Sequence, residues 1–153
     1  MQLITTNVAE IAVTYKNNLK NTEQQKIMCS NDAFRYLLNG YDPGTIGLQE
    51  QVVILYLNRN NNVLGVYRCA VGGITSAVVD TRLILSVALR IAAVGLMISH
   101  NHPSGNLKPS AYDEKLTQKL MQAAALLEIK LLDHIIVSGN GEEYFSFADE
   151  GYL

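Results

Sequence analysis

The chain has 153 residues, of which 48% are hydrophobic, and it carries a formal net charge of −2. A chain of this length forms one domain and buries roughly 70% of the surface that its unfolded form exposes, so a hydrophobic core is expected. The Lys and Arg residues are scattered, which argues against a protein that binds nucleic acid on its own. The sequence shows neither a basic leader nor a run of about 18 apolar residues. We therefore expect a cytoplasmic protein without a membrane span.

Residues 1–49 are predicted to supply a strand, a loop and a short helix that pack on the same domain as residues 50–153. Residues 8–15 tend to alternate apolar with polar or small side chains and are rich in β-formers, which predicts a strand near a sheet edge. The polar residues 16–28 predict a loop. Ser30 is then expected to cap a short helix, which a Gly and an Asp-Pro-Gly turn end.

The two cysteines, Cys29 and Cys69, lie far apart and form no Cys-x-x-Cys pair. Their spacing is not that of a redox motif or a structural zinc site. We expect both to be ordinary buried thiols, because a free Cys is usually a small apolar core residue.

A β-hairpin is predicted next. Residues 52–57 form a continuous apolar run, as expected for a strand that is covered on both faces. The Asn-rich residues 58–62 predict a turn, and residues 63–71 are then expected to return as the second strand of the hairpin.

A helix is predicted after this hairpin, with Asp80 or Thr81 as its N-cap. Its polar side chains fall four residues apart and are Arg82, Ser86 and Arg90. They leave nearly every other position apolar, so only a narrow stripe would meet water. We therefore expect this helix to be packed deep in the domain.

Three more strands and a long helix complete the chain. Residues 94–99 form a core strand that runs into His100, and a helix begins near Ser110. The apolar face of that helix comprises Leu116, Leu120, Ala123 and Leu127. Residues 131–137 and 143–147 predict two strands around a Gly-Asn-Gly turn. Because strands and helices alternate, with hairpins at both ends, the pattern indicates an α/β fold with a mixed sheet between helices.

The segment at residues 99–113, SHNHPSGNLKPSAYD, contains the candidate metal ligands. His100 and His102 are two apart at the end of a strand, so their side chains point to the same face with Cα atoms roughly 6 to 7 Å apart. The prolines turn the chain, and the next helix places Asp113 in its first turn. Two imidazoles and one carboxylate are three N/O ligands, the number that a catalytic zinc site uses while it leaves the fourth position to water. We therefore predict one zinc ion per chain, which would lower the pKa of water toward roughly 7.

Ser110 and Asp113 also have a purely structural explanation. Their spacing matches a helix capping box, in which the Ser side chain accepts from a backbone N–H and the acidic side chain reaches back. Two nearby histidines are also common in surface loops. The joint occurrence of His, Pro, Ser and Asp directly after a buried strand favours metal binding, and Ser110 can cap the helix in either case.

A zinc hydrolase also needs a general base close to the attacking water, usually a carboxylate that is not a metal ligand. Spacing does not identify it. The eligible residues are Glu10, Glu23, Glu50, Glu128, Glu142 and Glu143. Glu50 stands out only because it directly precedes the buried strand, and a generic exposed glutamate at a strand end would look the same.

The pattern of His100-x-His102, seven residues, Ser110, two residues and Asp113 resembles the JAMM (MPN+) metalloprotease motif. The longer string His-Asn-His-Pro-Ser-Gly, with LLDHIIV and FSFADEGYL further on, is similar to the RadC family of bacterial proteins. This likeness covers residues 50–153.

The resemblance implies an α/β/α sandwich with a mixed central sheet, similar to that of the cytidine deaminases. In JAMM enzymes the two His and the Asp bind zinc, an upstream Glu is the general base, and the Ser helps to stabilise the tetrahedral intermediate. Carried onto this sequence, the ligands are His100, His102 and Asp113, the base is Glu50, and Ser110 lies on the oxyanion side. The implied reaction is hydrolysis of an amide or isopeptide bond in a peptide or protein substrate.

Two features separate this chain from the family pattern. Longer RadC proteins carry an N-terminal helix-hairpin-helix segment associated with DNA, and residues 1–49 are too short and too strand-like for that module. RadC proteins also have no agreed substrate, so the resemblance implies a type of reaction and no particular target.

The alternative hypothesis is a non-catalytic metal-binding interaction module, attached to DNA-repair or mobile-element machinery. An open coordination position argues against it, because structural zinc sites are usually closed by four protein ligands. A magnesium nuclease usually gathers several carboxylates, whereas this cluster is rich in His. A zinc deaminase needs a His-x-Glu and a Pro-Cys-x-x-Cys sequence, which the chain lacks.

The third histidine, His134, lies beside Asp133 in the apolar run at residues 131–137. The RadC family pattern has the same pair. Structural hydrogen bonding is a commoner role for such a histidine than metal or substrate binding, and it is the role that we predict.

Overall fold

The computed structural model describes residues 9, 11–12, 14–17, 20, 23–74 and 76–153. The helices and strands of this part of the chain are α1 (Ser30–Leu38), β1 (Gln51–Leu57), β2 (Val63–Val71), α2 (Thr81–Arg90), β3 (Gly95–His102), α3 (Ala111–Leu126), β4 (Lys130–Ser138) and β5 (Tyr144–Ser146). The predicted hairpin, β1 with β2, is confirmed, as are the helices from Asp80 and Ser110. The strands predicted at residues 94–99 and 131–137 correspond to β3 and β4, although β3 begins one residue later, at Gly95.

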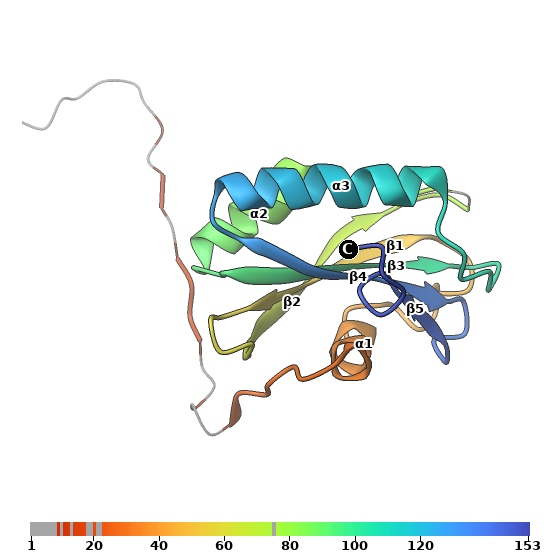
Figure 1. The fold of residues 1–153 in the computed structure, drawn as a ribbon, viewed down its shortest axis with the longest axis horizontal. Helices are drawn as coiled ribbons and strands as arrows, with labels where there is room; N and C mark the ends of the chain where they lie inside the picture. The colour runs from red at the N-terminus through yellow and green to blue at the C-terminus, as the bar shows by residue number, and fades with distance from the viewer. Residues whose placement is uncertain (1–8, 10, 13, 18–19, 21–22, 75) are drawn as a thin grey trace, which may run out of the picture.

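The five strands form one mixed sheet in the order β2-β1-β3-β4-β5. β3 and β4 are parallel, and each of the other neighbouring pairs is antiparallel. Figure 1 shows α2 and α3 on one face of the sheet and α1 on the other. The predicted α/β/α sandwich with a mixed central sheet is therefore confirmed.

All seven residues of β1 are buried, because the strand lies inside the sheet and both of its faces are covered. Val52, Ile54 and Tyr56 belong to the hydrophobic cluster under α2 and α3. The alternate residues Val53 and Leu55 belong to the cluster under α1. This double burial explains why β1 reads as a continuous apolar run instead of an alternating one.

The start of α1 differs from the prediction. Ser30 is the first helical residue, and the N-cap position is Cys29, which makes no side-chain capping hydrogen bond. The Asp32 carboxylate accepts from the Met28 N–H at 2.9 Å, so an acidic side chain in the first turn holds the segment that leads into the helix. The Ser30 hydroxyl instead donates to the Asp149 carboxylate, which ties α1 to the C-terminal segment.

The strand predicted at residues 8–15 is wrong for the part of that range that the structure describes. Residues 9, 11–12 and 14–15 are irregular, and the remaining positions lie outside the described residues. Ile11 is 89% exposed, so its apolar side chain has no sheet face to cover. The contacts here are isolated ones, such as the hydrogen bond that Arg90 donates to the Ala12 carbonyl.

The depth predicted for α2 is also wrong. Only Ile84, Leu85 and Ala88 are buried, whereas Leu83 and Leu89 are exposed. The helix covers an end of the sheet beside α3, and the described residues Ile11 and Ala12 lie beside its outer positions without burying Leu83 or Leu89.

Two smaller expectations about burial also fail. Leu127, predicted on the buried face of α3, is the C-cap residue and is 41% exposed, whereas Ala124 is buried. Cys29, at the N-cap of α1, is exposed and Cys69 on β2 is only half-buried, so the prediction of two buried thiols is wrong.

Among the residues that the structure describes, no helix combines the length and the apolar character that crossing a membrane requires.

Candidate metal centre

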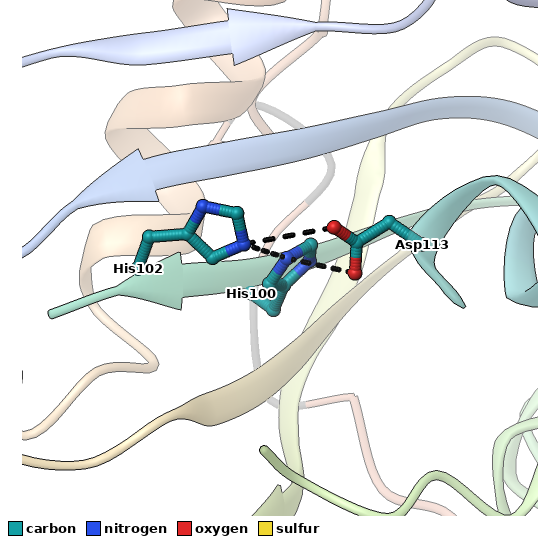
Figure 2. Close-up of side chains that lie close together, drawn as sticks. All are labelled: His100, His102 and Asp113. Carbon is teal, nitrogen blue, oxygen red and sulfur yellow. Dashed lines mark hydrogen bonds and ion pairs between the residues drawn. The ribbon is translucent and has the colours of Figure 1, made fainter. Parts of the chain in front are cut away.

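The site forms where β3 ends and α3 begins. β3 continues through His102, so His100 and His102 project from the same face of the sheet, toward α3. The chain then turns, and Ser110 caps α3 so that Asp113 lies in its first turn. Figure 2 shows the two imidazoles and the carboxylate converging on one point.

The distances within this group are those of a cation site. The Nε2 atoms of His100 and His102 are 2.9 Å apart. The Asp113 carboxylate places one oxygen 3.2 Å from His100 Nε2 and the other 3.6 Å from His102 Nε2. One ligand atom from each residue lies within 4.8 Å of the other two, and His100 and Asp113 are each only 5% exposed. The three residues could therefore hold a metal ion.

The two ring nitrogens of His102 have different surroundings. Its Nδ1 lies at the Asn106 carbonyl, which can only accept a hydrogen bond, so Nδ1 carries a proton. The nearby Asp113 carboxylate raises the pKa of His102 and outweighs the opposing effect of burial. His102 therefore presents Nε2 to the other two candidate ligands.

Asp113 belongs to both the candidate metal centre and the helix cap. Its carboxylate accepts from the Ser110 N–H at 2.7 Å, and its own N–H donates to Ser110 Oγ at 3.1 Å. The capping box is therefore present. Burial opposes ionisation of Asp113, but its close contacts with the imidazoles of His100 and His102 and the hydrogen bond from the Ser110 N–H outweigh it and hold the pKa of the carboxyl well below its ordinary value.

The loop after β3 is shaped by two glycines. Gly105 adopts a φ of +80°, a left-handed conformation that a residue with a side chain rarely adopts. Gly139, after β4, approaches the loop so closely that a Cβ atom there would lie 2.5 Å from the Pro103 carbonyl oxygen. The turn beyond β4 thus supports the loop that follows His102.

A cavity of about 430 Å³ opens beside these ligands. Its lining includes His102 and Asp113, together with Glu50 and Ser110. β1 and β3 are antiparallel with Val52 opposite His100, so Glu50, just before β1, lies at the level of His102. Sequence reasoning from spacing left the glutamate open, and of the eligible glutamates among the described residues only Glu50 lines this cavity.

Glu50 is half-buried, and its carboxylate accepts a hydrogen bond from the Ala77 backbone N–H. Burial raises its pKa above the ordinary value, and the nearby His100 and His102 partly offset this effect. The carboxylate is therefore both held in place and partly desolvated, as is common for an acid–base group in a functional cleft.

His134 lies behind the metal centre and is fully buried. Its Nε2 is 2.8 Å from His100 Nδ1, and its Nδ1 is 2.6 Å from the Thr117 hydroxyl oxygen. The role of Thr117 was not predicted. A polar residue four positions after Asp113, within the apolar face of a helix, is the signal that could have indicated it.

The comparisons with known proteins agree with this architecture. A five-stranded mixed sheet with three helices is consistent with the JAB (MPN) class of α/β domains. Within that class, the chain belongs to the family of RadC-like JAB domains, which it matches over residues 27–152.

Several bacterial relatives are similar along most of this chain. A UPF0758 protein of Flavobacterium johnsoniae is 39% identical over 129 residues, which cover 83% of this chain and 53% of the relative. A UPF0758 protein of Chlorobium chlorochromatii is 34% identical over 146 residues, covering 95% of this chain and 64% of the relative. The UPF0758 protein YfjY of Escherichia coli is 38% identical over 105 residues, covering 69% of this chain and 64% of the relative. The chain therefore spans between about half and two thirds of the length of these relatives.

Proposed function

We propose that this protein is a zinc-dependent hydrolase of the JAMM metallopeptidase type, which cleaves an amide or isopeptide bond in a peptide or protein. The observation that carries the proposal is the convergence of three potential ligands at a cavity that a half-buried glutamate and a serine hydroxyl also line.

The donor set favours zinc. Two imidazole nitrogens and one carboxylate suit Zn²⁺, and three protein ligands leave a coordination position open, as in catalytic sites. A zinc ion bound by His100, His102 and Asp113 would supply Lewis acidity, which acidifies water and polarises a carbonyl group. Structural zinc sites use four protein ligands, so the set of three described here argues against a purely structural metal.

Glu50 is the proposed general base. Its carboxylate accepts a proton from the attacking water, whose oxygen forms a bond to the carbonyl carbon. The same carboxyl group then gives the proton to the leaving nitrogen as the C–N bond breaks. The products are a carboxylic acid and an amine, and Glu50 returns to its initial state.

Ser110 is the proposed oxyanion donor. Its Oγ accepts from the Asp113 N–H, an arrangement that leaves the hydroxyl proton for another acceptor. That proton can be donated to the carbonyl oxygen as negative charge develops on it.

We expect Ser110→Ala to lower kcat by about 10²- to 10³-fold, the usual effect of removing one oxyanion donor. It should also lower the free energy of unfolding by about 1 kcal/mol, because α3 loses its N-cap. Ser110→Thr keeps a hydroxyl at this position and is the control for both effects. Kinetics and thermal unfolding of the two variants check the prediction, and full activity of Ser110→Ala would remove the serine from the mechanism.

Metal removal tests the proposed function as a whole. We expect inductively coupled plasma mass spectrometry to find about one zinc per chain, as a single site of three ligands requires. A chelator should abolish cleavage of a peptide library, and added zinc should restore it. If the folded protein takes up no zinc even after reconstitution, the hydrolase proposal fails and the non-catalytic interaction module becomes the better explanation.

A further inference from the structure

Four buried side chains form a closed ring of polar contacts behind the metal centre. They are His100, His134, Thr117 and Asp113, which are 5%, 0%, 2% and 5% exposed. Contacts run from His100 to His134, from His134 to Thr117 and from Thr117 to the Asp113 backbone. The ring closes where the Asp113 carboxylate lies 3.2 Å from His100 Nε2. We call this set the buried relay.

The position of each proton in the buried relay can be deduced in turn, starting from the hydrogen bond to the Asp113 backbone carbonyl. The Asp113 carbonyl can only accept, so the Thr117 hydroxyl donates to it, at 2.7 Å. The Thr117 oxygen must then accept on its other side, from the Nδ1–H of His134. The polar contacts of His134 are to a neutral hydroxyl and a ring nitrogen, and a second proton would make it a buried cation without a paired anion, which is costly. Its Nε2 is therefore an acceptor.

His100 is the donor to that nitrogen. With a proton on Nδ1, a neutral His100 has none on Nε2, and the Nε2 lone pair faces His102 and Asp113. The relay thus selects the one tautomer of His100 that can bind a cation at the metal centre.

We propose that His134 and Thr117 are positioning residues, which hold His100 in its metal-binding tautomer and couple it to Asp113. The inference rests on the proposed function only in taking His100 as a metal ligand. The second partner of a ligand histidine is usually a carboxylate, a backbone carbonyl or water. Here it is a neutral imidazole, so the centre keeps a more positive charge than a carboxylate in that place would allow.

The fold explains why these residues meet. β3 and β4 are parallel, with Ile98 opposite His134 and His100 opposite Ile136, so both rings project toward α3 from neighbouring strands. Thr117 lies four residues after Asp113, one helical turn along α3, and its hydroxyl reaches back to the Asp113 carbonyl. The register between β3 and β4 therefore positions the two histidines, and the turn of α3 positions Thr117 relative to Asp113.

Thr117→Val is the sharpest test, because it removes one hydroxyl and keeps the shape of the side chain. We expect the zinc affinity of the full chain, measured by competition with a chromophoric chelator, to fall by about 10- to 100-fold. Thr117→Ser should restore it. His134→Gln, whose carbonyl oxygen can replace Nε2 as acceptor, should bind zinc more tightly than His134→Leu. A merely structural role would lower the melting temperature of Thr117→Val and leave its zinc affinity unchanged, and this result would overturn the inference.

The tautomer of His100 gives a readout that needs no metal and no activity. We expect ring-nitrogen NMR of the metal-free chain to show His100 protonated at Nδ1 in the wild type and a mixture of tautomers in His134→Leu. A wild-type His100 protonated at Nε2 alone would refute the relay. If the wild type binds no zinc but shows the expected tautomer, the relay stands and the proposed function fails.

Discussion

Glu50→Gln is expected to lower kcat by about 10²- to 10⁴-fold, the usual contribution of a general acid–base group, while the zinc content stays unchanged. The amide has nearly the same shape as the carboxylate and can still accept the hydrogen bond from the Ala77 N–H. It cannot accept a proton from water at neutral pH. Because Glu50 is not one of the three candidate ligands, metal binding should survive the change.

The matched control is Glu114→Gln. Glu114 is exposed in the first turn of α3, next to Asp113 in sequence, and it does not line the cavity of Glu50. The same chemical change there should leave kcat within about threefold of the wild type, since it touches neither the base nor the ligands. Steady-state kinetics and metal analysis of both variants test whether Glu50 is the general base. A Glu50→Gln protein that cleaves at the wild-type rate would exclude Glu50 as the base.

Asp113→Ala should abolish zinc binding. Loss of an outer-shell partner usually costs roughly 10- to 100-fold in metal affinity, and loss of a ligand should cost more. Asp113 supplies both carboxylate oxygens near the two Nε2 atoms, so the remaining histidines would lose the negative charge that compensates a cation. His102→Ala should lose the metal as well, without altering the helix cap.

A second capping aspartate separates the two roles of Asp113. Asp80 is the N-cap of α2, where its carboxylate accepts from the Arg82 N–H at 2.9 Å, and it is not among the candidate ligands. We expect Asp80→Ala to lose about 1 kcal/mol of the free energy of unfolding. Metal-free Asp113→Ala should lose more, because its buried carboxylate also contacts the imidazoles of His100 and His102. Only Asp113→Ala should lose zinc in equilibrium dialysis. Retention of one zinc per chain by Asp113→Ala would show that the carboxylate is not a ligand.

The sequence predicted the β3–α3 region well because its signals are local. The apolar strand, the His-x-His spacing and the Ser-x-x-Asp cap each depend on residues close together in the chain, and α3 begins as expected after Ser110. The hairpin of β1 and β2 was predictable for the same reason, since an Asn-rich turn joins two runs of strand-forming residues.

Predictions failed where the outcome depended on distant packing. Alternation at residues 8–15 indicated a strand, but no sheet edge pairs with the described residues of that range. The apolar character of α2 suggested deep burial, yet Leu89 is 56% exposed. Composition shows how much apolar surface a segment has, and only the tertiary fold decides whether another element covers it.

The buried relay illustrates the same limit within the site. Sequence analysis placed His134 in a strand with a structural hydrogen-bonding role, but its partner depends on the parallel register between β3 and β4. Thr117 joins only because α3 lies over that register. The four-residue spacing could have indicated the contact of Thr117 with Asp113, but no spacing within the chain reveals that either Thr117 or His100 contacts His134.

The three candidate ligands, the turn between them and the helix cap all fall within residues 100–113. Neither of the two hydrophobic clusters formed by the described residues includes a member of that stretch. The three candidate ligands and the hydrophobic core are thus encoded in separate parts of the gene. A few substitutions within residues 100–113 can therefore remove the candidate metal centre and leave the hydrophobic core intact, so a chain that can bind a metal and a chain of the same fold that cannot can differ by few steps of descent.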